Sequence, residues 1–122
     1  MARSLMELSG DWENQNGSVL SIGRVESGAF SGSFVSAKGR AARGRSYPVA
    51  GVVNGSLVAF AVNFVDEHDN LGSISNFTGR LDDGVLHTVW VLARAFEDSE
   101  RSKPTQPWNT FLVNADRFEK RR

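Results

Sequence analysis

The sequence predicts an all-β protein, folded as an eight-stranded antiparallel up-and-down β-barrel. Its 122 residues contain twelve glycines, and short apolar runs alternate with polar residues, as in strands that bury one face. No window sustains the period of an amphipathic helix, which is 3.6 residues. Turn pairs punctuate the chain at roughly ten-residue intervals. Eight meandering strands close most economically into a barrel.

The first three strands are expected at Gly10–Asn14, Ser18–Val25 and Ala29–Ser36. In each of them alternate side chains are large and apolar, so that one face of the strand can be buried. A Ser27-Gly28 pair separates the second strand from the third. Glycine favours a tight turn at this point because it accepts positive φ angles.

The middle three strands are expected at Tyr47–Val53, Leu57–Phe64 and Ser73–Leu81. Asn54-Gly55 lies between the first two of these. Asn-Gly pairs favour the positive φ angles of two-residue hairpin turns, which join antiparallel neighbours. We therefore expect these strands to follow one another as a meander.

The last two strands are expected at Val85–Ala95 and Trp108–Glu119, and the first of them is entered through an Asp83-Gly84 turn. The Asp-Gly pair predicts another tight antiparallel hairpin. Longer connections are predicted at three other places, which are Ala37–Ser46, Val65–Gly72 and Phe96–Pro107.

Alternation within the strands predicts which side chains face the interior of the barrel. The interior set is Trp12, Asn14, Ser18, Leu20, Ile22, Phe30, Gly32, Phe34, Ser36, Phe60, Val62, Phe64, Ser73, Ser75, Phe77, Thr88, Trp90, Leu92, Trp108, Leu112 and Asp116. Small polar groups recur in this set at matching depth, mixed with aromatic rings toward one end. A buried polar group without a partner costs ~1–3 kcal/mol. Water or a bound molecule must therefore meet these groups, and the pattern predicts a ligand pocket.

Two of the longer connections follow strands at the polar end, where they can form lids over the mouth of the barrel. The first connection is basic and the second is acidic: Lys38, Arg40, Arg43 and Arg45, against Asp66, Glu67 and Asp69. Short charged loops are usually solvated surface. We therefore interpret neither as a nucleic-acid or metal site.

The composition of the chain restricts the possible classes of function further. The chain is expected to form one domain over residues 1–122, with its core at about 10–119. Fourteen basic and fourteen acidic residues give no net charge, so no overall field attracts nucleic acid or an anionic membrane. The chain has no cysteine, which excludes disulfides and thiolate metal sites, and no apolar run is long enough to span a membrane.

The outward faces of the last two strands are apolar at Val89, Val91, Phe111, Val113 and Ala115. Contiguous exposed apolar area of this kind usually marks association between subunits. Scattered surface residues are the alternative interpretation. The pattern predicts a homo-oligomer, without deciding between a dimer and a tetramer.

Five segments carry a resemblance to a known family. They are GDWENQNGS at 10–18, GSFVSA at 32–37, FAVNF at 60–64, TVWVL at 88–92 and DRF at 116–118. Together they resemble the avidin and streptavidin family of biotin-binding proteins, over almost the whole chain. The resemblance implies high-affinity, non-covalent binding of biotin in the open end of the barrel, with no chemistry, no catalytic residue and no cofactor. It also implies a secreted protein and favours a tetramer. Because residues 1–7 lack the apolar stretch of a signal peptide, the chain is either a mature secreted form or cytoplasmic.

The resemblance assigns the polar residues to parts of biotin. Asn14 and Ser18 match family positions that donate to the ureido oxygen, while Asp116 and Ser36 match the acceptors for the two ureido N–H groups. An ionised Asp116 would polarise the ureido group and so strengthen the donors at its oxygen.

The apolar walls are implied in the same way. Phe64, Phe77 and Trp90 match the aromatic box of the family, with Leu92 beneath them. Of the small polar residues, Ser75 matches the group beside the ring sulfur, and Ser73 matches one near the tail. Trp108 matches a tryptophan that reaches the pocket of a neighbouring subunit, and Trp12 an interior tryptophan near the barrel floor.

The sequence departs from the family pattern at four positions. Phe64 and Phe77 replace residues that are tryptophan in streptavidin, and the other two departures are Phe34 and Lys38. Phe34 stands where the family usually has a tyrosine that donates to the ureido oxygen, and losing a neutral hydrogen bond weakens binding by ~0.5–1.5 kcal/mol. Lys38 stands where a small apolar lid residue is common. A loop lysine is most often solvated, although this one could pair with the valerate carboxylate.

Two other functional classes compete with biotin binding. The Gly10-Asp11-Trp12 segment also fits the G-x-W signature of lipocalins, but an apolar cup fits poorly with a ring of serines and Asp116. An enzyme would use Asp116 as a general base, yet His87 is expected to point outward and His68 lies in a loop. The sequence therefore favours biotin binding, with a lipocalin-like carrier of a small hydrophobic ligand as the alternative and an enzyme as the less favoured class.

Overall fold

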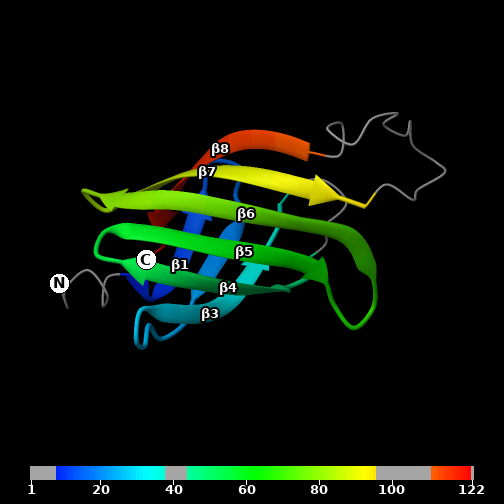
Figure 1. The fold of residues 1–122 in the computed structure, drawn as a ribbon, viewed down its shortest axis with the longest axis horizontal. Helices are drawn as coiled ribbons and strands as arrows, with labels where there is room; N and C mark the ends of the chain where they lie inside the picture. Colours follow the sequence, from blue (N-terminus) through cyan, green and yellow to red (C-terminus); the bar gives the residue numbers. More distant parts are fainter. Residues whose placement is uncertain (1–7, 38–43, 96–110, 122) are drawn as a thin grey trace.

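The computed structural model describes residues 8–37, 44–95 and 111–121. Eight strands form a closed barrel in which each strand pairs antiparallel with the next and the last pairs with the first. Figure 1 shows β3 to β8 side by side in chain order, with β1 behind them. The strands are β1 (Gly10–Asn14), β2 (Val19–Ile22), β3 (Ala29–Val35), β4 (Tyr47–Asn54), β5 (Leu57–Val65), β6 (Asn70–Asp82), β7 (Val85–Arg94) and β8 (Phe111–Lys120). The predicted fold class is confirmed.

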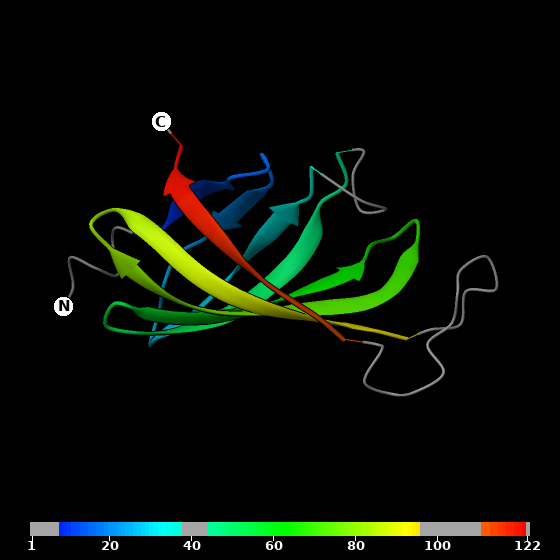
Figure 2. The same cartoon turned by 90° about the horizontal axis from the view of Figure 1, so that it is seen from above.

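The seam between β1 and β8 closes the barrel. Trp12 pairs with Lys120 and Asn14 pairs with Phe118, and in Figure 2 the end of β8, in red, lies beside β1, in blue. Closure leaves no unpaired sheet edge, because the hydrogen-bonding groups of the first strand meet those of the last. It also places residues from the two ends of the chain within reach of each other.

Two of the predicted hairpin turns have the backbone expected of them. Ser27 and Gly28 have φ angles of 52° and 75°, and Asp83 and Gly84 have 53° and 79°. Two consecutive positive angles give a turn the twist that matches its flanking strands. The prediction is off by one residue at Asn54-Gly55: Asn54 is the last residue of β4 and pairs with Leu57, so the turn itself is Gly55-Ser56.

The connection between β5 and β6 is shorter than predicted. The sequence predicts a connection from Val65 to Gly72, but β6 already begins at Asn70. The Asp66 carboxylate accepts hydrogen bonds from the backbone N–H groups of His68 and Asp69, both at 2.8 Å. Because this turn satisfies its own amides, the strands pair almost to its ends, and Val65 lies opposite Asn70 beyond a bulge.

Aromatic rings fill much of the barrel interior. Phe60 stacks on Phe77 with ring centroids 4.6 Å apart, and Phe118 meets both rings edge-on. Trp12 is buried and donates its indole N–H to the carbonyl of Leu8 at 2.8 Å. This agrees with the interior position predicted for Trp12, and a buried indole N–H needs such an acceptor.

Alternation places one residue wrongly. It predicts Leu112 in the interior, but the side chain of Leu112 is 45% exposed. It lies near the start of β8, where the residues from Phe111 to Ala115 are all exposed. A side chain on the inward face is therefore not buried at this point of the strand. Within the described part of the chain, no helix is long and apolar enough to cross a membrane.

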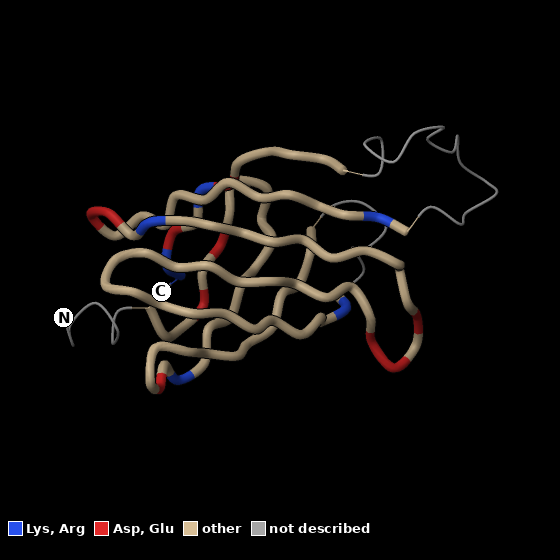
Figure 3. Tube along the Cα trace, viewed as in Figure 1, with Lys and Arg blue, Asp and Glu red and all other residues tan. Residues whose placement is uncertain are grey.

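Charged residues are absent from β4 and β5. Figure 3 shows β4 and β5 without charged positions, whereas acidic residues gather at the β5–β6 connection. A guanidinium nitrogen of Arg45, which precedes β4, lies 3.9 Å from a carboxylate oxygen of Asp66 and 4.0 Å from one of Asp69. Arg45, which belongs to the predicted basic connection, therefore lies beside the predicted acidic connection.

Candidate functional site

Asp116 is the centre of a hydrogen-bonded cluster at the β1–β8 seam. It lies on the same face of β8 as the buried Phe118. The side-chain amide of Asn14 donates to Asp116 Oδ2 at 3.1 Å, and that of Gln15 donates to Asp116 Oδ1 at 2.9 Å. Both carboxylate oxygens are thus held by neutral amides, and each keeps a lone pair for another donor.

Thr88 joins the same cluster from β7. It lies directly opposite Asp116 in the β7–β8 pair, it is buried, and its hydroxyl donates to the backbone carbonyl of Asp116 at 2.9 Å. The hydroxyl of Thr88 therefore fixes the backbone from which the carboxylate projects. Its own proton is already used and is not available to a ligand.

The β1–β2 turn arranges the donors. Asn14 Oδ1 accepts hydrogen bonds from the backbone N–H groups of Asn16, at 3.0 Å, and Ser18, at 2.9 Å. These bonds fix the orientation of the amide, so that its NH₂ group faces Asp116. One N–H of that group is bound to the carboxylate, and the second remains for an acceptor such as a urea oxygen.

Ser18 is buried at the end of the β1–β2 turn, directly before β2. Its Oγ accepts the backbone N–H of Ala37 at 2.9 Å. A hydroxyl that accepts in this way can still donate its own proton. Ser18 and Asn14 therefore each retain a proton for a ligand acceptor, and the joint role that the family resemblance implied for them stays a prediction.

Gln15 is the site residue that sequence reasoning missed. Alternation places it on the outward face, but β1 ends at Asn14, so Gln15 belongs to the turn and is released from alternation. Its Oε1 accepts the backbone N–H of Arg117 at 2.9 Å while its Nε2 donates to Asp116. A polar residue directly after a strand end, beside a predicted site residue, was the available signal.

The aromatic part of the site is continuous. Phe34 lies 6.3 Å, centroid to centroid, from both Phe64 and Phe77, and Phe77 lies 6.3 Å from Trp90. Leu92 packs against the same core, and Ser75 is buried on β6. The three rings predicted for the apolar wall come from β5, β6 and β7, and Phe34 joins them from β3, so the closed sheet brings four strands together here.

The structure gives less information on the other predicted site residues. Ser36 and Ser73 are partly buried, the first just beyond β3 and the second on β6. Lys38 and Trp108 lie outside the described residues, so their assignments stay predictions.

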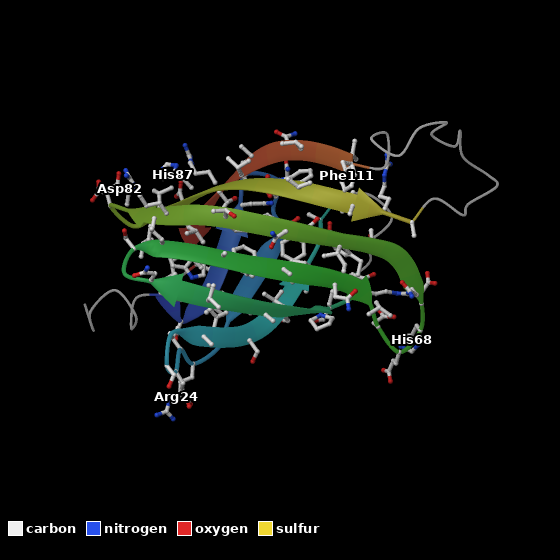
Figure 4. All side chains as sticks on the ribbon, viewed as in Figure 1. Arg24, His68, Asp82, His87 and Phe111 are labelled. Atoms are coloured by element: carbon white, nitrogen blue, oxygen red, sulfur yellow. The ribbon has the colours of Figure 1, made fainter. Side chains whose placement is uncertain are left out.

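The histidines do not reach the cluster around Asp116. Figure 4 shows His68 at the β5–β6 connection and His87 at the other end of the barrel, beside the β6–β7 turn. Both side chains are exposed. Within the described ranges, no group of three or more His, Asp or Glu side chains is arranged to hold a metal ion.

An exposed apolar surface covers β7 and β8. Val89 lies opposite Ala115, and Val91 lies opposite Val113, which is 66% exposed. Phe111, also exposed, lies on the same side of the sheet near the end of β7 (Figure 4). The predicted outward apolar residues are therefore contiguous.

Comparisons with known proteins agree with this architecture. A model described as the avidin family matches residues 2–121. Afifavidin from Afifella pfennigii is 30% identical over 113 residues, which cover 88% of this chain and 70% of that protein. Apo shwanavidin (P1 form) has a TM-score of 0.78 at 25% identity, covering 93% of this chain and 97% of that one. A single-residue variant of shwanavidin in complex with biotin has a TM-score of 0.76 at 26% identity, covering 93% and 97%. A bradavidin2–biotin complex has a TM-score of 0.71 at 27% identity, covering 90% and 93%.

Proposed function

The chain belongs to the avidin family, and on this basis we propose that it binds biotin non-covalently and with high affinity inside the barrel. The observation that carries the proposal is the Asp116 carboxylate, oriented by Asn14 and Gln15 on a face shared with the buried core. It gives a cyclic urea an acceptor for one N–H group, beside two donors for the urea oxygen. Two relatives of similar fold were solved as complexes with biotin.

The arrangement suits a bicyclic ligand with one polar and one apolar part. Asn14 and Ser18 offer protons toward one point, while Asp116 offers lone pairs nearby. The rings of Phe34, Phe77 and Trp90 supply apolar surface for the rest of the ligand. A carboxylate that polarises the urea strengthens the bonds to its oxygen, so these contacts reinforce each other.

We propose further that the protein carries out no reaction. Acid–base catalysis by Asp116 would need a partner that can exchange a proton with it, and the side chains bonded to this carboxylate are amides. Turnover of a biotin ester, lost in Asp116→Ala, would contradict this part of the proposal.

Self-association is part of the same proposal. The apolar surface on β7 and β8 supports a homo-oligomer, with a tetramer favoured and a dimer as the alternative. Trp108 would then cross into the pocket of a neighbouring subunit and couple assembly to affinity.

The first experiment is isothermal titration of the protein with biotin, in parallel with a fatty acid. Asp116→Ala should weaken biotin binding by roughly ten- to hundredfold, because it removes a charged acceptor worth ~1.5–3 kcal/mol. Lys38→Ala is the matched control and should have a much smaller effect. Equal effects of the two substitutions would contradict the role of Asp116, and binding of the fatty acid alone would indicate an apolar carrier.

A further inference from the structure

Tyr47, the first residue of β4, carries a hydroxyl group with no role in the site described above. Its side chain is 1% exposed, and Tyr47 Oη is buried without a hydrogen-bond partner among the described residues. A buried hydroxyl that bonds to nothing destabilises the folded chain. Such groups are rare in native proteins and usually have a specific reason, such as a bound water or ligand.

The position of Tyr47 suggests the reason. It lies directly opposite Phe34 in the β3–β4 pair, and its ring meets Phe64 edge-on with centroids 5.2 Å apart. Phe34 and Phe64 also contact each other. Tyr47 is therefore packed among the rings that form the predicted wall of the biotin site.

The same chain of rings ends in a second unpaired polar atom. From Tyr47 it passes through Phe64, Phe34 and Phe77 to Trp90 on β7. Trp90 Nε1 is also buried without a hydrogen-bond partner in the described part of the chain. The aromatic wall thus has an unused donor at each end, which is unexpected for rings that only fill a core.

We infer that Tyr47 is a further ligand-recognition residue, whose hydroxyl gains a hydrogen bond when biotin occupies the barrel. The acceptor is an oxygen of the ligand, reached directly or through one ordered water. This inference rests on the proposed binding of biotin. It implies that the hydroxyl has opposite effects on stability in the two states. It destabilises the free barrel, and it stabilises the complex with biotin.

The test is Tyr47→Phe, which removes the hydroxyl and keeps the ring. The dissociation constant for biotin should rise about two- to tenfold, as expected for one neutral hydrogen bond. The melting temperature of the free protein should stay the same or rise, because an unpaired buried group is removed. Ser31→Ala is the matched control, since it removes an exposed hydroxyl from β3 and should change neither quantity.

A second measurement uses the wild-type protein. Tyr47 is the sole tyrosine of the sequence, so tyrosine labelled with ¹³C at Cζ gives one NMR resonance. Addition of biotin should shift this resonance as the hydroxyl becomes bonded, and the same label in Ser31→Ala should respond equally.

The outcomes separate this inference from the proposed function. If wild-type protein binds no biotin, the proposed function itself is wrong. If it binds biotin while Tyr47→Phe has the same affinity and the labelled resonance does not move, the inference about Tyr47 is wrong. It is also wrong if Tyr47→Phe lowers the melting temperature of the free protein, because the hydroxyl would then have a partner in that state.

Discussion

Asp116 shows how one side chain can be prepared for binding by contacts from distant parts of the chain. Its carboxylate is held by Asn14 and Gln15, which precede it by 102 and 101 residues. Both partners are neutral, so they orient the carboxylate without cancelling its charge. A lysine or arginine in their place would satisfy the same oxygens but reduce the negative potential available to a ligand N–H group.

Phe34 offers a direct test of the ligand position. Phe34→Tyr places a hydroxyl beside the predicted urea oxygen and should tighten biotin binding by roughly two- to tenfold. It should also lower the stability of the free protein, because Phe34 is buried among other rings and the new hydroxyl lacks a partner there. Isothermal titration and thermal melts measure the two effects. A weaker complex would show that the cavity is shaped around phenylalanine.

Individual residues were predictable where the strand period applies. Asn14 and Ser75 are buried as alternation required, because each lies within or at the end of a strand with one buried face. Ser18 is also buried, although β2 begins only at Val19. Gln15 and Leu112 escape this rule for a common reason. The alternation of a strand does not predict whether a side chain is buried in a turn or at the exposed start of a strand.

The β5–β6 connection shows how a single carboxylate can stabilise a turn between two strands. The pKa of Asp66 is lowered from its ordinary value of 3.8, mainly because the backbone N–H of His68 donates to it, with smaller contributions from the Asp69 N–H and from Arg45. Partial desolvation acts in the opposite direction. The ionised form is therefore the one that the folded turn favours.

This connection should have a defined pH dependence. A lowered carboxyl pKa stabilises the folded turn above pH 3.8, and that contribution is lost as the pH falls through the lower folded-state pKa. The rate of amide hydrogen exchange at His68 and Asp69, corrected for intrinsic rates, should therefore increase only below pH 3.8.

Asp66→Asn is the informative variant for this prediction. It keeps an acceptor oxygen for the two backbone amides but cannot ionise in this range, so the acid-dependent step should disappear. If Asp66→Asn retained the same acid transition, another group would be responsible for it.

The whole barrel determines which surfaces remain available. Closure through the β1–β8 seam uses up the sheet edges, so one subunit cannot associate with another by extending its sheet. On β7 and β8, the apolar side chains of Val89, Val91 and Val113 are exposed and form one candidate interface. We propose that subunits associate through side chains of this face.

Val113→Lys tests that arrangement. A charge in the middle of an apolar interface is costly to bury, so size-exclusion chromatography with light scattering should show a smaller species than wild type. Biotin affinity should fall in parallel if Trp108 contributes to a neighbouring pocket. Ser31→Lys, on the exposed face of β3, is the control and should leave the mass unchanged. An unchanged mass for Val113→Lys would place the interface elsewhere.

The strands, their antiparallel order and most of the buried face could be read from the residues alone, because they depend on local properties. These are the two-residue period of a strand and the positive φ angles of turns such as Asp83-Gly84. The cluster around Asp116 depends instead on closure of the barrel, which brings residues 14 and 116 together. The same applies to Tyr47, whose hydroxyl has no hydrogen-bond partner among the described residues, a fact that only the pairing of the strands around it reveals. Contacts between distant segments arise from packing in three dimensions, and no local pattern along the chain encodes them.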